Sequence, residues 1–471
     1  MTQKRLAIIG GGLAGSEAAL QLAGLGLQVD LYEMKPEKRS AAHHSDTLAE
    51  IVCSNSFGSQ GESTASGLLK LEMEALGSKL LEIARQVAVP AGKALAVDRE
   101  QFTARVTETV QNHPLIHLHC EEVTELPEAD YILIATGPLT TPALVEAIGR
   151  LLNRKQLYFF DAASPIIARD SIDFGIAYIS DRYANEKTNA SDITETNAAE
   201  QSYINCPLDK PQYEALLTAL LASEKTELKD FEKESASYFE SCLPIEVIAS
   251  RGIDTLRYGP FKPVGLPDPK TGQIPHAVVQ LRQDNAEGTL YNMVGCQTNI
   301  KWGDQKKIIQ MIPGLTNAEV VRYGVMHRNT YIHSPEVLAP TLQLKQHPHI
   351  LFAGQLTGTE GYSESIATGL WAALNMARLA LGQTPGIPPK TTMLGALLHY
   401  ITRAEAIGKD FQPINSNWGI LEPLDIASFT DVKTYKLLRR NKPQRNAYYA
   451  ERALTVIKQY IFETKEAIPL L

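Results

Sequence analysis

The stretch Lys4-Arg-Leu-Ala-Ile-Ile-Gly-Gly-Gly-Leu-Ala-Gly15 decides the fold of this chain. Its first half is a short apolar run that predicts a buried strand, and its glycines lead without a spacer into a helical pattern that begins at Ser16. A second strand is predicted from Leu27 to Glu33. Together these segments form a βαβ unit, in which glycines allow close backbone approach to a pyrophosphate and the helix N-terminus offers unpaired N–H groups.

The glycine-rich turn and the acid that follows it predict a dinucleotide site. Glu33 ends the second strand 18 residues after Gly15, where its carboxylate would accept a hydrogen bond from a ribose hydroxyl. A glycine-rich turn without a ligand is the alternative, but the offsets of strand, helix and acid all favour binding. The turn residues expected to contact the dinucleotide are Gly10, Gly11, Gly12, Leu13, Ala14 and Gly15.

Two later segments favour FAD over NAD as the dinucleotide. The strand Tyr131-Ile-Leu-Ile-Ala-Thr-Gly137 resembles one that flavoproteins of the glutathione-reductase type place near their cofactor. The strand His349-Ile-Leu-Phe-Ala-Gly-Gln355 also meets glycine, and a helix is predicted from Ser365 to Ala380. In such flavoproteins the late helix points its N-terminus at the flavin, so Gly354 and Gln355 should contact FAD.

We therefore expect an α/β fold of the glutathione-reductase type, with a Rossmann FAD-binding domain. A chain of 471 residues is too long for one core, and the two parts of the FAD site lie at opposite ends of it. We predict a discontinuous FAD-binding domain over residues 1–190 and 303–390, with an inserted α+β domain over 191–302. A helical, basic C-terminal segment over 391–471 should pack on the FAD domain.

Composition argues against several other classes of protein. No apolar run reaches the ~18 residues that a membrane span needs, and no signal-cleavage pattern follows the N-terminus. We therefore expect a cytoplasmic protein with no membrane partner. The five cysteines are scattered, with no pair at zinc-ligand spacing, which argues against a disulfide framework and against a metal.

Charge is segregated along the chain. The formal net charge is −8, but residues 433–458 contain eight Lys and Arg and one acid, so this segment carries +7 and the remainder −15. Three tyrosines interleave with these cations, a mixture typical of a surface that binds phosphates and stacks on bases. A solvated amphipathic helix is the alternative. These tyrosines are Tyr435, Tyr448 and Tyr449.

Two cysteines lie in settings that suit a reactive thiol. Cys53 is flanked by small polar residues, and Cys242 lies just before Pro244, which makes a continuing helix improbable there. A thiolate near a cation or at a helix start has a lowered pKa and is the nucleophilic form. A buried, inert thiol is the alternative for each. We interpret the remaining cysteines as structural: Cys120, Cys206 and Cys296.

Five segments resemble one family closely, the FAD- and folate-dependent tRNA (uracil-5-)-methyltransferases of bacteria. The resemblance runs from residue 2 to about residue 460, and the two cysteine motifs are its most specific part. The segments are Gly10-Gly-Gly-Leu-Ala-Gly-Ser-Glu17, Glu50-Ile-Val-Cys-Ser-Asn-Ser56, Phe239-Glu-Ser-Cys-Leu-Pro-Ile-Glu246, Arg322-Tyr-Gly-Val-Met-His-Arg-Asn329 and Gly354-Gln-Leu-Thr-Gly-Thr-Glu-Gly-Tyr362.

The resemblance implies methylation at C5 of uridine 54 in the T-loop of tRNA. The carbon would come from 5,10-methylenetetrahydrofolate, with reduction by FADH2 that NAD(P)H regenerates. It implies that Cys242 attacks C6 of the uracil and that Cys53 is a base or carrier near the flavin. No obligate protein partner is expected. The residues that would hold folate and substrate are Trp302, Tyr362 and Arg328, and those that would bind tRNA are Lys436, Arg439, Arg440 and Arg445.

Other functions stay open at this point. For Trp302 and Tyr362, packing beneath a loop is the alternative to stacking on a ligand. Flavoproteins that modify the wobble uridine with a GTPase partner are related, but they carry Cys-Asn-Pro where this chain has Cys-Ser-Asn-Ser. A thiol-disulfide flavoenzyme would use Cys53 and Cys242 together, although 189 residues separate them. A non-catalytic flavin-bearing scaffold protein is a further alternative.

Overall fold

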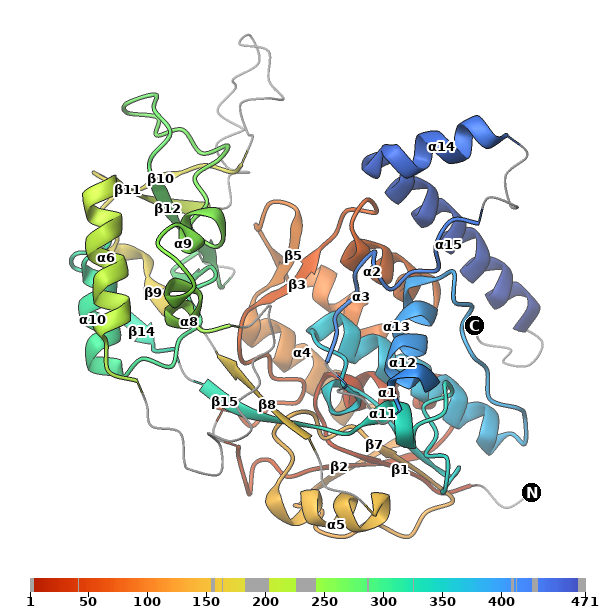
Figure 1. Cartoon of the computed structure of the whole chain (residues 1–471). Helices are drawn as coiled ribbons and strands as arrows, with labels where there is room; N and C mark the ends of the chain where they lie inside the picture. The colour runs from red at the N-terminus through yellow and green to blue at the C-terminus, as the bar shows by residue number, and fades with distance from the viewer. Residues whose placement is uncertain are drawn as a thin grey trace.

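Two units of different architecture make up the chain (Figure 1). The first is built on a five-stranded parallel sheet and the second on a six-stranded antiparallel sheet. The computed structural model describes residues 4–40, 42–153, 157–162, 164–182, 203–225, 243–285, 288–324, 326–407, 411, 413–425 and 431–464.

The parallel sheet contains the predicted βαβ unit and extends it on both sides. Ile9 of its central strand lies opposite Tyr32 on one neighbour and Ile134 on the other. The carboxyl ends of the strands therefore meet at one edge, where open parallel sheets bind their ligands. In spatial order the strands are β16 (Ile350–Phe352), β7 (Tyr131–Ile134), β1 (Leu6–Ile9), β2 (Val29–Glu33) and β6 (Ile116–Cys120).

Helices cover both faces of this sheet. Figure 1 shows α1 (Leu13–Gly24), α4 (Arg99–Gln111) and α12 (Tyr362–Ala380) above it and α5 (Pro142–Leu152) below. A Cβ atom on Gly369 would lie 2.3 Å from the carbonyl oxygen of Ala14, so α12 and α1 approach more closely than any other residue would permit. Within the described ranges, no helix is long and apolar enough to cross a membrane.

A small antiparallel sheet and further helices complete the first unit. The sheet has the order β3 (Ser56–Ser59), β5 (Ala94–Val97) and β4 (Ala88–Val89). The helices are α2 (Ala65–Ala75), α3 (Lys79–Gln86), α11 (Ser334–Val337) and α13 (Met393–Thr402). Side chains before α2, α3, α4 and α13 accept a hydrogen bond from the first turn of the helix, which fixes where each begins.

The C-terminal helix α15 (Lys442–Thr464) lies against the first unit, and α14 (Val432–Arg440) packs on α15. Ala450, Ala453 and Ile457 of α15 are buried in the same apolar core as the parallel sheet. The Arg378 guanidinium lies 5.8 Å from the ring centres of both Trp371 and Tyr460, so it joins α12 to the end of α15.

The second unit comprises residues 164–182, 203–225, 243–285 and 288–324 and has a core of its own. Its helices are α6 (Lys210–Ala222), α8 (Ile245–Ser250), α9 (Thr255–Tyr258) and α10 (Trp302–Gln310). Its strands, in spatial order, are β10 (Tyr178–Ile179), β11 (Tyr203–Leu208), β12 (Ala277–Gln283), β13 (Leu290–Met293), β9 (Ile166–Ala168) and β14 (Val320–Arg322).

The second unit is larger than the insertion predicted over 191–302. Strands β9 and β10 come before that range, and α10 and β14 extend beyond its end. These strands have only two or three residues each, and β9 pairs with β13 and β14, more than 100 residues away in sequence. Local composition does not reveal strands this short whose partners lie so far away in sequence. The boundaries predicted for the inserted domain, 191 and 302, are therefore too narrow.

Two strands connect the units. The chain leaves the first unit through β8 (Leu157–Ala162) and returns through β15 (Met326–Tyr331), and these strands pair in antiparallel fashion from Leu157↔Tyr331 to Ala162↔Met326. The two connections therefore run side by side, as Figure 1 shows.

A buried carboxylate on α2 should make the stability of the first unit depend on pH. Glu72 is fully buried and accepts the backbone N–H groups of Met393 and Leu394 at 2.7 and 2.8 Å. Burial raises the pKa of Glu72 from 4.5 to about 8. Between these values the folded protein keeps a proton that the unfolded chain releases, so the free energy of unfolding should fall with rising pH, by at most about 1.4 kcal/mol per unit.

Urea denaturation at about pH 5.5 and about pH 7.5 measures this slope. Glu72→Gln should flatten it, because the amide cannot ionise and its oxygen still accepts from the start of α13. The matched control is Glu74→Gln on the same helix, where the carboxylate is one-third exposed and pairs with Arg85. An unchanged slope in Glu72→Gln would contradict the assignment.

Candidate active site

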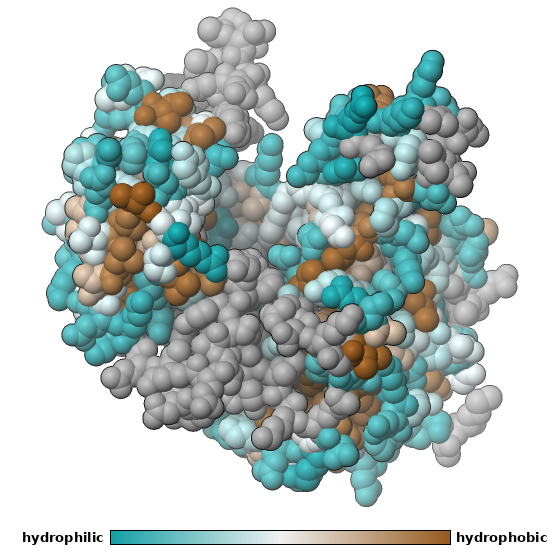
Figure 2. Space-filling model, in the orientation of Figure 1, coloured by the Kyte–Doolittle hydropathy of each residue, from teal (hydrophilic) through white to brown (hydrophobic). Residues whose placement is uncertain are grey.

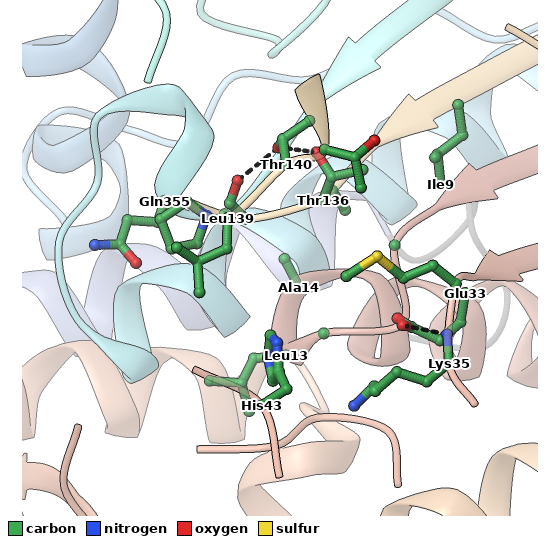
Figure 3. A pocket seen from close by; sticks show the side chains of 18 of the residues that line it. Ile9, Leu13, Ala14, Glu33, Lys35, His43, Thr136, Leu139, Thr140 and Gln355 are labelled. Atoms are coloured by element: carbon green, nitrogen blue, oxygen red, sulfur yellow. Dashed lines mark hydrogen bonds between the residues drawn. The ribbon is translucent and has the colours of Figure 1, made fainter. Parts of the chain in front are cut away.

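A cavity of about 160 Å³ lies at the carboxyl edge of the parallel sheet (Figure 3). Its walls come from the glycine-rich turn, the end of β2, the segment after β7 and the start of α12. Figure 3 shows Leu13 and Ala14 between Gln355 and Leu139 on one side and Glu33 on the other. The two ends of the sequence that predicted a dinucleotide site therefore line one cavity.

The glycines of the turn have separate roles. Gly10 has a φ of +103°, and a Cβ atom on Gly15 would lie only 1.8 Å from the Gly10 carbonyl oxygen, so position 15 must be glycine for the helix to pack on the turn. Gly12 lines the cavity, and a Cβ atom there would meet no protein atom within 4 Å. Gly12 therefore leaves space on the side where a ligand would lie.

Glu33 is held from two sides by backbone donors. Its Oε2 accepts the N–H of Gly11 at 2.8 Å, and its Oε1 accepts the N–H of Lys35 at 3.1 Å. Each carboxylate oxygen has a further lone pair, so a ribose hydroxyl can also be bound. Gly11 and Gly15 thus act behind the cavity, whereas the other predicted positions line it: Gly10, Gly12, Leu13, Ala14, Glu33, Gly354 and Gln355.

The start of α12 supplies the opposite wall. Gly354 and Gly358 take φ values of +74° and +83°, which bend the chain around the short turn η5 (Gln355–Thr357). Gln355 donates to Glu360 at 2.6 Å, which orients its amide. The N-cap residue of α12, Gly361, has no side chain to bond the first turn, so the backbone N–H groups of that turn suit an anionic or carbonyl ligand.

Cys53 is joined to the first residue of α12. The Tyr362 hydroxyl oxygen lies 2.9 Å from Cys53 Sγ and accepts the backbone N–H groups of Cys53 at 2.9 Å and Ser54 at 3.3 Å. Burial and the nearby thiol hold the pKa of Tyr362 well above its usual value. Tyr362 and Val52 both line the cavity, so the half-buried Cys53 thiol contacts a residue of the cavity wall.

Several residues near Cys53 were missed in the sequence. Arg99 donates to the carbonyl oxygens that precede Cys53, and Asn55, two residues after Cys53, is completely buried. Arg322 is half-buried, and burial, followed by the adjacent Arg99 guanidinium, lowers its pKa. Asn55 and Arg322 lie in two of the segments that carry the family resemblance, but the resemblance gave no role to their side chains. Only the fold brings positions 55, 99 and 322 together.

The remaining predicted folate and substrate residues are not brought to the cavity by the described contacts. Trp302 is the first residue of α10, is 59% exposed, and stacks on Tyr323 with ring centres 5.5 Å apart. Arg328 pairs with Phe160 in the β8–β15 ribbon, and its side chain lies outside the described residues. Cys242 also lies outside them, directly before the buried Leu243 of the second unit.

The basic C-terminal segment forms a hydrophilic surface at α14. Figure 2 shows this surface at the upper right, across a hollow from the second unit. Lys436 and Arg440 are exposed, Arg445 is half-buried, and the side chain of Arg439 lies outside the described residues. The prediction for Tyr449 is wrong, because its ring is buried and stacks on Trp418 with centres 6.0 Å apart.

The other described cysteines differ in environment. Cys206 and Cys296 are buried, and burial raises the pKa of each thiol to about 12, so both are inert as predicted. Cys120 is exposed at the end of β6, contrary to a core position. Across the part of the chain that the structure describes, no three His, Cys, Asp or Glu side chains are grouped as a metal site would require.

Comparison with known proteins covers almost the whole chain. A family model described as "Glucose inhibited division protein A" matches residues 5–384. A protein of Desulforamulus reducens named methylenetetrahydrofolate--tRNA-(uracil-5-)-methyltransferase TrmFO is 50% identical over 465 residues, which are 99% of this chain and 99% of the relative. The chain belongs to the TrmFO family. A further TrmFO, from Lysinibacillus sphaericus, is 52% identical over 461 residues, or 98% of this chain and 99% of the relative.

A solved structure also supports the fold of this TrmFO family member. GidA of Aquifex aeolicus, in its form II crystal, superposes with a TM-score of 0.66 over 99% of this chain and 75% of the GidA chain. The two sequences are 16% identical, so the likeness concerns the fold alone. The predicted family and the predicted α/β FAD-binding fold are both confirmed.

Proposed function

We propose that this protein methylates C5 of uridine 54 in the T-loop of tRNA, with the carbon taken from 5,10-methylenetetrahydrofolate. FAD would be the resident cofactor and NAD(P)H the source of electrons, in the cytoplasm and without an obligate protein partner. Identity of about half the residues along the whole chain to proteins named for this reaction supports the activity. The structural observation that carries it is a thiol, Cys53, 2.9 Å from the hydroxyl of Tyr362, which lines a dinucleotide-type cavity.

The residues of the cavity fit FAD. Gly12 leaves room for a close ligand, the N-terminus of α1 has no side-chain cap, and Glu33 offers carboxylate oxygens at the end of β2. We expect Gly12 and the N-terminus of α1 to hold the pyrophosphate and Glu33 to hold a ribose. When bound, FAD supplies the electrons that reduce the transferred carbon to a methyl group.

The two thiols have complementary roles in the proposed mechanism. C5 of uracil is a poor nucleophile until the Cys242 thiolate adds to C6, which gives an enolate whose C5 attacks the electrophilic methylene carbon of the folate. This attack breaks the bond from that carbon to one folate nitrogen. A base must then take the C5 proton, so that the remaining bond to folate breaks, tetrahydrofolate leaves and an exocyclic methylene forms on C5. Reduction of this methylene, with electrons that FAD would supply, gives the methyl group as the Cys242 thiolate leaves C6. Cys53 is our candidate for that base, and the Tyr362 hydroxyl, 2.9 Å from its sulfur, would orient it.

The tRNA must reach this site with its target base turned out of the stack, at a cost of a few kcal/mol. The hollow between the second unit and α14 is bounded on one side by the exposed cations of that helix (Figure 2). Cations that contact phosphates contribute affinity without sequence preference. We therefore place the tRNA backbone along α14, where it would extend toward the second unit.

Variants of α14 test this tRNA surface. Replacing both Arg439 and Arg440 by alanine should weaken tRNA binding and reduce the slope of log affinity against log salt by about 1 to 2, because two phosphate contacts are lost. Filter binding over a range of salt concentrations measures both quantities. Lys4→Ala, an exposed cation near the N-terminus, is the control and should change neither. Unchanged binding by the double variant would mean that α14 is only a solvated helix.

A labelled-carbon assay tests the function itself. The purified protein, supplied with FAD, carbon-labelled methylenetetrahydrofolate, NADPH and unmodified tRNA, should transfer label to tRNA, and a tRNA with cytidine at position 54 should receive none. Cys242→Ala should abolish transfer, whereas the control Cys120→Ala, which removes an exposed thiol, should not. No transfer by the unchanged protein would favour a partner-dependent or non-catalytic function, and full activity of Cys242→Ala would refute the nucleophile.

A further inference from the structure

The segment that carries Cys53 has no regular secondary structure, so side-chain contacts decide where the thiol lies. Residues 51–55 belong to neither a helix nor a strand. Arg99, the first residue of α4, donates from Nη1 to the carbonyl oxygens of Ile51 at 2.8 Å and Val52 at 3.4 Å. These carbonyls directly precede Cys53, so the guanidinium fixes the backbone that leads into the thiol.

The same guanidinium is paired with the second unit. Nε of Arg99 lies 3.1 and 2.9 Å from the two carboxylate oxygens of Asp284, which follows β12. The Asp284 side chain is only 3% exposed and that of Arg99 11% exposed. Breaking such a buried pair is costly, because removing one partner leaves the other charge uncompensated. The Asp284 backbone N–H donates to Leu290 at 2.8 Å, which ties the carboxylate to the β12–β13 connection.

Asn55 makes a second connection between the units on the other side of Cys53. Its amide donates to the carbonyl oxygens of Gln283 at 2.9 Å and Val97 at 3.0 Å. Its oxygen accepts from Nε of Arg282 at 3.3 Å. Three consecutive residues at the end of β12 therefore reach the Cys53 segment, at positions both before and after the thiol.

The charges at this junction are mostly positive. Arg282 and Arg322 both interact with Arg99 and Asp284, and Glu50 is the other carboxylate that acts on Arg322. Asp284→Asn would therefore leave the junction with one more net positive charge, since Arg99 would lose its carboxylate partner. The change would also free the guanidinium to leave the carbonyls of Ile51 and Val52.

We propose that Asp284 is a positioning residue for Cys53 and acts through Arg99. The thiol then reaches its catalytic position only when the end of β12 contacts the first unit. The inference rests on the proposed function, in which both thiols act on one uracil ring.

Alkylation of Cys53 and methyl transfer together test this role in the FAD-bound, full-length protein. Asp284→Asn should raise the iodoacetamide labelling rate of the Cys53 peptide, read by mass spectrometry, by about fivefold, because the segment loosens and the added positive charge favours the thiolate. It should lower kcat by about 10- to 100-fold, with the KM for tRNA unchanged within about twofold. The control is Asp254→Asn, which removes an exposed carboxylate of the second unit, 4.0 Å from Arg257 at α9, and should change none of these.

A double-mutant cycle distinguishes an effect of Asp284 that passes through Arg99 from a general destabilisation of the interface between the units. Arg99→Lys keeps a charge but cannot span two carbonyls and a carboxylate, so it should behave like Asp284→Asn. Arg99→Lys combined with Asp284→Asn should be no worse than Arg99→Lys alone, within about twofold, because both changes break one connection. Should Asp284→Asn fail to fold, Arg99→Lys carries the same test.

Independent, additive effects, or unchanged labelling and kcat in Asp284→Asn, would overturn the inference. Labelling needs no methyl transfer, so its outcome does not depend on the proposed reaction. An unchanged protein that labels normally but transfers no carbon would instead refute the proposed function alone.

Discussion

Cys53→Ala should reduce methyl transfer to tRNA by about 1,000-fold while FAD remains bound. The variant loses the thiol that lies 2.9 Å from the Tyr362 hydroxyl, and with it the candidate base for the C5 proton. The backbone N–H groups of residues 53 and 54 still donate to Tyr362, so the segment should keep its place. Single-turnover transfer of labelled carbon measures the loss, and flavin absorbance measures cofactor content.

Tyr362→Phe is the matched comparison for Cys53→Ala. It removes the hydroxyl that bonds the Cys53 segment but keeps the ring, whose centre lies 5.6 Å from that of Phe57. We expect a loss of about tenfold, because the thiol remains and only its orientation is relaxed. If Cys53→Ala kept more than about a tenth of the rate, Cys53 would hold the segment in place and would not take part in proton transfer.

Gly15→Ala should prevent both cofactor binding and stable folding of the first unit. The added methyl group would lie 1.8 Å from the carbonyl oxygen of Gly10, so α1 must move away from the turn, at a cost of several kcal/mol. Urea denaturation and flavin content of the purified protein measure the two effects.

Alanine substitutions at two other glycines, Gly24 and Gly12, serve as controls for Gly15→Ala. Gly24→Ala, at the end of the same helix, adds a methyl group with no atom within 4 Å and should be neutral or stabilising by up to about 1 kcal/mol. A methyl group on Gly12 also meets no protein atom, so Gly12→Ala should fold normally yet bind FAD much more weakly. Normal FAD binding by Gly12→Ala would mean that the pyrophosphate lies elsewhere.

The sequence predicts the part of the fold that local patterns encode. The buried run before Gly10, the helix after Gly15 and the strand that ends at Glu33 lie in the structure nearly where the periodicity places them. The predicted late helix was found to begin at Tyr362 and not at Ser365. These elements depend on residues within about 30 positions of one another, and such local patterns can be recognised in a single sequence.

The rest of the site depends on contacts between distant parts of the chain. That Tyr362 holds a folate stays a prediction, and the bond from its hydroxyl to Cys53, 309 residues away, was not predicted. The pairing of Arg99 with Asp284 spans 185 residues, and nothing in the local sequence of either residue points to the other. Burial of a charge is similarly invisible in sequence, because it is decided by the packing of two separate units.

The paired strands β8 and β15 have an evolutionary consequence. Ala162 and Met326 face each other in the ribbon, so the points at which the second unit leaves and rejoins the first are neighbours about 5 Å apart. A module whose ends are adjacent can be inserted into a host, or exchanged for another, without breaking the host's own core. In this protein the second unit is joined in this way, so it could be exchanged while the parallel sheet and its cavity stay unchanged.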